Sequence, residues 1–140
     1  MGELYVGQTE IVKVGSRKGT PGTWVSRGDL AVWDYSKNEL TLDGAYHDLD
    51  LSAIFPEGTT WGFFRIWARP TDIEKSFSLK PGGYSGDVNK LVVTSVVGNA
   101  AVGLLGFIPI PASRVIQYSA DTGTTWTEIY FSVLGWVLEG

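Results

Sequence analysis

Cysteine is absent from this 140-residue chain, and histidine occurs once, as His47. The lack of thiols excludes disulfide scaffolds, cysteine-based zinc sites and thiol catalysis. A single imidazole excludes multi-histidine metal sites, and a Ser-His-Asp triad could be built only around this residue. Because His47 shares one face of an alternating segment with Leu49 and Leu51, we expect it to be packed and hydrogen-bonded rather than catalytic. No metal or other cofactor is expected.

Charge is scarce as well, at 19% of residues, and it sums to −4 at pH 7. Nucleic-acid binding needs clustered cations, so this balance argues against a nucleic-acid partner. The length fits a single domain. Glycine is abundant, with 18 residues, and Trp, Tyr and Phe number 6 each. Many turns together with many aromatic side chains favour an all-β protein.

The stretch between Lys90 and Arg114 carries no charge and is long enough to cross a bilayer. Glycines, polar residues and two prolines interrupt it, which disfavours a helix. We interpret its valine-rich part as two strands joined at Gly98 and Asn99. The first residues of the chain also lack the basic and apolar pattern of a secretory signal, so no membrane partner is expected.

Short segments of alternating apolar and polar residues recur along the chain, separated by turn residues. This spacing predicts a single antiparallel β-sandwich of jelly-roll-like form over residues 23–140. The polar, glycine-rich residues 1–22 are predicted to form an N-terminal arm or edge strand. Residues 30–35 and 39–42 bracket a turn and predict a hairpin. The other predicted strands cover residues 10–14, 46–51, 61–69, 76–80, 91–97, 102–108, 114–119 and 126–138.

The last of these strands is apolar on two faces. Strict alternation places Ile129, Phe131, Val133 and Val137 on one face. A strand of a small sandwich should have one wet face, so the second face is expected to meet another copy of the chain. A well-covered central strand within one subunit is the alternative. The predicted subunit-interface residues are Phe63, Trp67, Tyr130, Leu134 and Trp136.

Residues 119–126 match the Asp-box pattern S-x-D-x-G-x-T-W. The aspartate accepts turn hydrogen bonds, the glycine takes a positive φ, and the tryptophan packs over the turn. Every residue of the motif is explained by turn chemistry, so we predict a structural hairpin turn and no glycosidase activity. The residues of this predicted turn are Ser119, Asp121, Gly123, Thr125 and Trp126.

Three carboxylates, Asp43, Asp48 and Asp50, cluster in the sequence. Paired carboxylates bind Ca²⁺ or serve as acid and base. Their spacing matches no calcium loop, and a solvated strand face explains them more simply. Whether they bind a cation is left open.

Three of the six tryptophans, Trp24, Trp33 and Trp61, lie near predicted turns. Exposed aromatic rings can stack on sugar rings, so these residues are the candidates for a carbohydrate site. Packing in a core or interface accounts for most tryptophans and is the alternative.

Several segments together resemble a known module. Residues 47–52 read HDLDLS, a Pro56-x-Gly58 loop follows, and residues 64–69 form an aromatic and basic strand. An Ile116-x-Tyr118 strand and a closing Leu-Gly-Trp at residues 134–136 complete the pattern. Over residues 46–138, the order and spacing resemble the C-terminal β-sandwich module of tailed-phage fibre and capsid-decoration proteins. The resemblance implies a trimeric virion component without enzymatic activity.

The resemblance and the short chain favour a capsid decoration (cement) protein. Such a homotrimer would lie on the capsid surface of the virion and bind the major capsid protein through the N-terminal arm, adding modest affinities by multivalency. One alternative is a carbohydrate- or receptor-binding tip module of a tail or head fibre. Another is a glycan hydrolase, which would need two carboxylates facing each other across a cleft.

Overall fold

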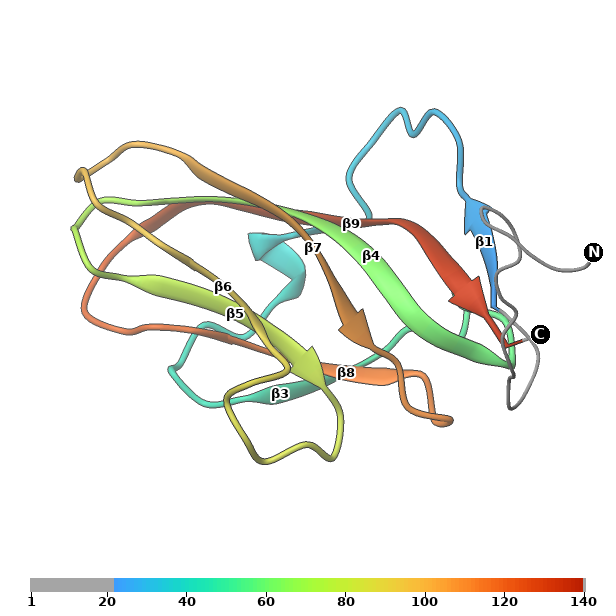
Figure 1. The fold of residues 1–140 in the computed structure, drawn as a ribbon. Helices are drawn as coiled ribbons and strands as arrows, with labels where there is room; N and C mark the ends of the chain where they lie inside the picture. Colours follow the sequence, from blue (N-terminus) through green and yellow to red (C-terminus); the bar gives the residue numbers. More distant parts are fainter. Residues whose placement is uncertain (1–21, 140) are drawn as a thin grey trace, which may run out of the picture.

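The computed structural model describes residues 22–139, and these residues form two antiparallel β-sheets packed face to face (Figure 1). The prediction of an all-β sandwich is confirmed. The predicted strand over residues 10–14 lies outside the described residues, and so does the predicted arm except for Gly22.

The two sheets differ in size and order. Sheet A has five strands in the order β1-β9-β4-β7, with β2 also paired to β9. Sheet B has four strands in the order β3-β8-β5-β6. Sheet A consists of β1 (Thr23–Ser26), β2 (Tyr35–Ser36), β4 (Thr59–Pro70), β7 (Val102–Pro109) and β9 (Trp126–Leu138). Sheet B consists of β3 (His47–Asp50), β5 (Ser76–Pro81), β6 (Leu91–Thr94) and β8 (Val115–Ala120).

The core lies between the sheets and follows from alternation along each strand. On β4, Phe64, Ile66 and Ala68 are fully buried, as their spacing of two residues predicts. Burying a large apolar side chain stabilises the fold by roughly 1.5–3 kcal/mol. The other fully buried apolar residues are Leu51, Phe55, Phe77, Leu79, Ile116, Ala120, Ile129, Phe131 and Val133.

Strand β9 contains a bulge that the sequence pattern does not reveal. Phe63 pairs with Gly135, but the next residue, Phe64, pairs with Val133, so Leu134 is an extra residue on β9. A bulge shifts the alternation by one position and re-aims the side chains that follow.

The shifted alternation reverses the faces expected for two residues. Trp136 pairs with Gly62 and packs edge-on against the buried Phe55 ring, with the ring centroids 6.0 Å apart. It therefore lies on the inner face, although strict alternation places it on the outer face. Val137 pairs with the exposed Trp61 and lies on the outer face. Both assignments from the sequence were wrong because the bulge intervenes.

The hairpin expected over residues 30–42 does not form. Its first half contributes only β2, which pairs with β9, and the chain then enters the short 3₁₀ helix η2 (Lys37–Glu39). Asp34 directs this path, because its backbone N–H donates to Ser132 Oγ at 2.8 Å and its carboxylate accepts from the Val133 N–H at 2.9 Å. These bonds hold the segment against β9 in place of the expected partner strand.

The uncharged stretch before Arg114 forms β6 and β7, as the valine pattern predicts, although β6 ends at Thr94. The two strands belong to different sheets and do not pair with each other. Asn99 in the connection has a φ of 57°, a left-handed conformation that asparagine tolerates. Within residues 22–139, no helix has the length and apolar character needed to cross a membrane.

Candidate functional site

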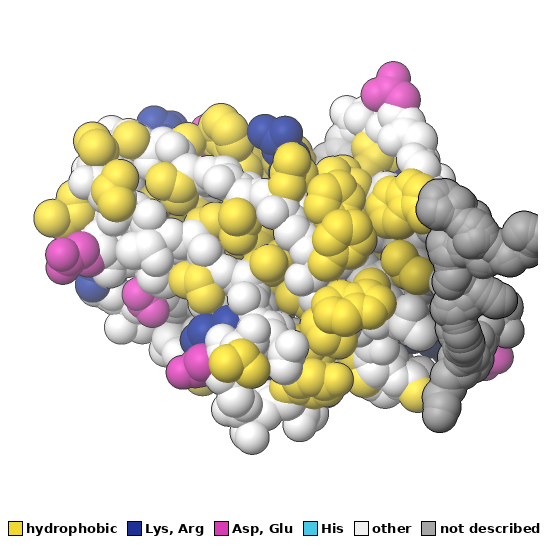
Figure 2. All heavy atoms as spheres, in the orientation of Figure 1, with side chains coloured by type: hydrophobic (Ala, Val, Ile, Leu, Met, Phe, Trp, Pro, Cys, Tyr) yellow, Lys and Arg dark blue, Asp and Glu magenta, His cyan; other side chains and the backbone are white. Residues whose placement is uncertain are grey.

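The outer face of sheet A exposes large apolar side chains. Trp24 is 48% exposed, Trp61 44%, Leu105 52% and Phe107 48%. In Figure 2, apolar side chains gather over the part of the molecule where β1, β4 and β7 lie. We call Trp24, Trp61, Phe63, Leu105 and Phe107 the aromatic face. A contiguous exposed apolar patch marks an interaction surface more often than a folding requirement.

Strand register brings the aromatic face together from distant parts of the chain. Phe63 of β4 and Phe107 of β7 are register partners, and their rings stack with centroids 4.5 Å apart. Trp24 of β1 meets both rings edge-on, at 6.0 and 6.1 Å. Trp24 and Trp61 each pair with Val137 and therefore flank this residue on either side. Two of the three predicted ligand tryptophans thus share one surface.

Gly135 makes room for this arrangement. A Cβ built on Gly135 would collide with the Trp24 ring and would lie 2.5 Å from the Val25 carbonyl oxygen. The missing side chain lets the indole cover the backbone of β9 and reach Phe63. Sequence reasoning treats Gly135 only as part of a closing motif and misses this role.

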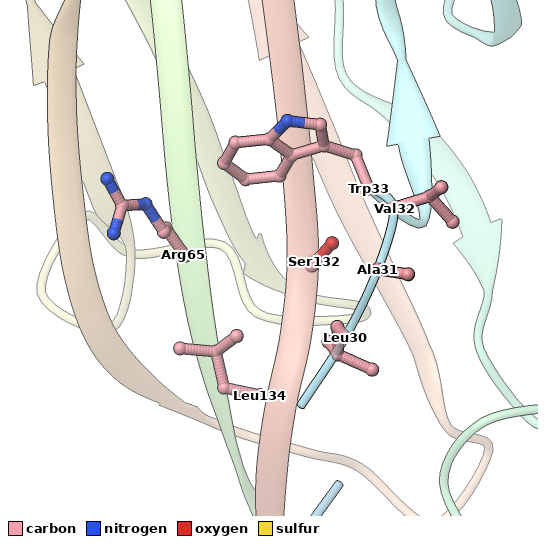
Figure 3. A pocket seen from close by; sticks show the side chains of 7 residues that line it. All are labelled: Leu30, Ala31, Val32, Trp33, Arg65, Ser132 and Leu134. Carbon is pink, nitrogen blue, oxygen red and sulfur yellow. The ribbon is translucent and has the colours of Figure 1, made fainter. Parts of the chain in front are cut away.

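The third tryptophan, Trp33, lies elsewhere on the same outer face, beside a pocket of about 300 Å³ (Figure 3). Its ring stacks on Tyr130 with centroids 5.5 Å apart and an interplanar angle of 17°. The Arg65 side chain borders the pocket from β4, and its guanidinium lies 5.9 Å from the centre of the Trp67 ring. The pocket is lined by Leu30, Ala31, Val32, Trp33, Arg65, Ser132 and Leu134.

The loop that carries Trp33 is anchored to β9. Arg27 forms an ion pair with Asp34 at 2.6 Å and donates a second hydrogen bond to the Val133 carbonyl at 2.9 Å. The Arg27 N–H donates to the Leu134 carbonyl at 3.0 Å. These bonds hold residues 27–34 across the outer side of the closing strand.

The loop of residues 27–34 covers part of the surface of β9 that was predicted to meet a second subunit. Tyr130 is covered by Trp33 of the same chain, and the partly buried Trp136 packs on the inner side against Phe55. The apolar character of these two residues is therefore satisfied within one subunit and does not require a second copy. The uncovered apolar surface lies instead on the aromatic face.

The other predicted interface residues do lie on the outer face of sheet A. Phe63 belongs to the aromatic face, and Leu134 lines the Trp33 pocket. Trp67 donates its Nε1–H to Glu128 at 3.0 Å, and Glu128 also lies 3.6 Å from Arg69. Polar partners of the same chain thus hold Trp67.

The Asp-box forms a structural turn, but it does not close a hairpin. It joins β8 of sheet B to β9 of sheet A, which do not pair with each other. Asp121 accepts a hydrogen bond from the Ser76 N–H at 2.9 Å, and Gly123 has a φ of 78°. The buried Trp126 donates its Nε1–H to the Asp121 carbonyl at 3.0 Å.

The two remaining motif residues also bind neighbouring segments. Ser119 is 8% exposed and donates to the Gly44 carbonyl at 3.2 Å, while the Thr125 N–H donates to Thr71 Oγ1 at 3.2 Å. Trp126 thus bonds back to the turn, and the aspartate is directed to β5 rather than to its own turn.

The acidic cluster is held by hydrogen bonds within the chain. Asp43 lies 2.7 Å from His47 Nε2, and the imidazole hydrogen bond keeps the pKa of Asp43 below its usual value. Asp48 accepts from Gln117 Nε2 at 2.8 Å. Asp50 accepts from the Ser52 N–H at 2.8 Å, which lowers its pKa. Among residues 22–139, no group of three or more acidic or histidine side chains could hold a metal ion.

The fold brings together one pair of carboxylates that the sequence pattern does not predict. Glu57 and Glu139 are far apart in the sequence and both line a pocket of about 450 Å³ at the start of β4. The Glu139 N–H donates to the Gly58 carbonyl at 2.8 Å, which brings the end of β9 to this loop. Both glutamates are exposed, so the pair lacks the apolar pocket in which a catalytic acid is usually held.

No protein-family model, no curated protein and no solved structure matches this chain. The interpretation of the outer face of sheet A therefore depends on its geometry and on the sequence resemblance.

Proposed function

We propose that this chain is a non-enzymatic structural protein of a tailed-phage virion. In this proposal it is a homotrimeric capsid decoration protein, which binds the major capsid protein at the capsid surface with help from its N-terminal arm. The aromatic face is the surface that packs between subunits. The observation that carries the proposal is the half-exposure of four large apolar residues on this face, together with the sequence resemblance over residues 46–138.

Exposure to water makes the aromatic face a favourable surface for burial. Large apolar side chains left in water lack the stabilisation that burial would give. This stabilisation is about 25 cal/mol for each Å² of apolar surface covered. Aromatic residues are enriched in protein interfaces, where they act as anchors. A trimer that buries three such faces is rigid, and three weak capsid contacts then act together.

The oligomeric state tests the first part of this proposal. The full chain is expected to have a molar mass in solution three times its 15.2 kDa, measured by light scattering at micromolar concentration. The double variant Trp61→Ser/Phe107→Ser is expected to shift this assembly to monomers, by about 30-fold or more in dissociation constant. The matched control is Val92→Ser, which changes an exposed apolar residue on sheet B. A monomeric full chain, or a double variant that assembles normally, would contradict the proposal.

Capsid binding tests the second part. The chain is expected to co-sediment with capsids of the phage whose genome encodes it, and the double variant is expected to lose most of this binding because single sites lack multivalency. Binding of the double variant equal to that of the full chain would separate capsid attachment from trimer formation and would contradict the role given to the aromatic face.

Carbohydrate binding is the second candidate, and the Trp33 pocket favours it over the aromatic face. The pocket combines one aromatic ring, a guanidinium and apolar walls, and its volume is at the lower end for small-molecule sites. Trp24 is less suited to stacking on sugars, since it contacts Phe63 and Phe107 edge-on as part of a cluster.

Calorimetry with a panel of neutral and acidic oligosaccharides tests this candidate. Trp33→Ala is expected to lower the affinity for a bound sugar about tenfold or more, whereas Trp33→Phe keeps an aromatic ring and retains most of it. If no oligosaccharide binds, or if Trp33→Ala binds as well as the unchanged chain, the carbohydrate candidate is rejected.

A further inference from the structure

Strand β7 ends sheet A with a row of backbone groups that no described residue uses. The Ile110 N–H donates to the Thr60 carbonyl at 2.9 Å. With the register between β4 and β7, this bond shows which residues of β7 direct their backbone groups toward β4. Alternate residues of an antiparallel strand direct their N–H and C=O groups to the same side. The groups of even-numbered β7 residues therefore face β4, and those of Gly103, Leu105 and Phe107 face away from the sheet. Within residues 22–139, no hydrogen bond reaches these three residues.

The β7 edge also has little of the usual protection against strand addition. Natural edge strands are kept short, carry charged side chains or proline, or are bent by bulges. Strand β7 has eight residues, carries no charge, shows no register shift along its pairing with β4, and has its one proline, Pro109, at its last position. By contrast, β6 at the corresponding edge of sheet B has four residues. An edge of this kind is a template for another extended segment.

We infer that β7 accepts residues 10–14 of a second copy of this chain as an added strand of sheet A. The inference rests on the proposed homotrimer and specifies how its subunits are joined. The segment Glu-Ile-Val-Lys-Val alternates, with Ile11 and Lys13 on one side and Val12 and Val14 on the other. Beside β7, one side of the segment would extend the aromatic face next to Leu105 and Phe107, and the other would face the sandwich interior.

The position of the described N-terminus favours a second copy over the same chain. Gly22 precedes β1, which lies at the opposite end of sheet A from β7. To reach β7 of its own subunit, the arm would cross three strand spacings of about 4.8 Å each. Residues 15–21 (GSRKGTP) would then lie over the aromatic face, where polar and charged groups lose water without gaining partners.

A neighbouring subunit avoids this cost. Seven residues span up to about 23 Å when extended, which is enough to leave one subunit and reach the next. Exchange of arms in one direction is a heterologous contact, and such contacts form a closed ring, here the proposed trimer, when the rotation between subunits closes. Residues 1–9 remain available for the capsid.

Hydrogen exchange at single amides tests the inference on the full chain. The N–H groups of Leu105 and Phe107 are expected to exchange about 100-fold more slowly than in a chain lacking residues 1–14. The N–H groups of Leu104 and Ile108, which face β4, serve as internal controls and are expected to stay protected in both chains. Loss of assembly on removal of residues 1–14, measured by light scattering, is expected alongside.

A proline at position 105 tests the same contact without truncation. Leu105→Pro removes an outward-facing N–H and leaves the hydrogen bonds to β4 intact, because proline is tolerated at strand edges. It is expected to abolish the trimer, whereas Leu105→Ala keeps the N–H and is expected to weaken the trimer only through the lost leucine contact on the aromatic face. Equal loss of assembly in both variants would assign the effect to the leucine side chain and would overturn the inference. Circular dichroism checks that each variant keeps its strands.

Other occupants of the β7 edge give different results. Protection of Leu105 and Phe107 that persists in a dilute monomer would show that the arm returns to its own subunit, which overturns the inference. Protection that survives removal of residues 1–14 would point to pairing between two β7 strands and would also overturn it. A trimer whose Leu105 and Phe107 amides exchange freely would reject the inference and leave the proposed function standing, whereas a monomer with the same free amides would reject both.

Discussion

The outer faces of the two sheets expose different kinds of side chain to water. On sheet B, polar side chains pair across strands: Gln117 donates to Asp48 at 2.8 Å, and the Ser76 and Thr94 hydroxyls lie 2.7 Å apart. On sheet A, the corresponding positions of β4 and β7 carry the stacked rings of the aromatic face. Both sheets contribute fully buried side chains to the core, so the difference lies in their outer faces.

The comparison indicates which surface the sequence reserves for contacts. A sandwich subunit needs only one apolar face on each sheet, and sheet B follows this rule. The outer face of sheet A keeps large apolar residues in water, which a lone subunit does not need for folding. Four predictions test this distinction, from the largest expected effect to the smallest.

Two adjacent residues of β4 give the strongest test. Phe64→Ala, on the inner face, is expected to lower the free energy of unfolding by about 3–5 kcal/mol, because it leaves a cavity in a fully buried site. Phe63→Ala, on the aromatic face, is expected to lower it by only about 0.5–1.5 kcal/mol through the lost ring contacts. Urea unfolding at low protein concentration measures both. Similar values would mean that the aromatic face contributes to folding as much as the core does.

The turn that joins the two sheets should respond at an intermediate level. Gly123 has a φ of 78°, and Gly123→Ala is expected to destabilise the chain by about 1–2 kcal/mol, since an L-residue is strained there. Gly86→Ala is the matched control, because Gly86 lies in a loop with no atoms within 4 Å of a built Cβ and is not among the residues with positive φ. Thermal unfolding compares the two. An unchanged midpoint for Gly123→Ala would show that the turn relaxes and does not fix the connection between sheets.

The polar ladder of sheet B should contribute less. Gln117→Ala removes the hydrogen bond to Asp48 and is expected to lower stability by about 0.2–1 kcal/mol, the range for an exposed cross-strand pair. Val92→Thr, a substitution of similar shape on the same face, is expected to have no effect on stability. A loss for Gln117→Ala larger than that for Phe63→Ala would reverse the contrast between the two faces.

The smallest effect concerns pH. The hydrogen bond from His47 lowers the pKa of Asp43 below its ordinary value of 3.8. A carboxylate with a lowered folded pKa stabilises the chain above the unfolded pKa and loses this contribution as the pH falls through the folded value. Stability is therefore expected to drop between about pH 5 and about pH 2, and Asp43→Asn is expected to flatten this part of the curve. Parallel curves for the two proteins would show that Asp43 contributes nothing.

Much of the fold was predictable because alternation is a local property. The buried Phe64, Ile66 and Ala68 and the alternating exposure of β3 follow directly from residues two apart. The Asp-box residues predict a turn because each has a local conformational preference, and the chain passes from one sheet to the other there. The hydrogen-bond partner of Asp121 was not predictable, because Ser76 lies on another strand, 45 residues away in the sequence.

The candidate site was harder to predict, since it depends on register between distant strands. The bulge at Leu134 arises from a mismatch between β4 and β9, which no window of β9 contains. Trp136 and Val137 were consequently assigned to the wrong faces. Trp24 and Trp61 were proposed for one function on their positions near turns, but their common surface depends on both pairing with Val137.

The absence of a side chain at Gly135 makes the aromatic face controllable through a single methyl group. Gly135→Ala would displace the Trp24 indole and push against the Val25 carbonyl, so it would also loosen β1 from β9, without altering any aromatic residue or any charge. Substitution at this one position would therefore separate Trp24 from Phe63 and Phe107. The aromatic face would be disrupted in a chain whose composition is nearly unchanged.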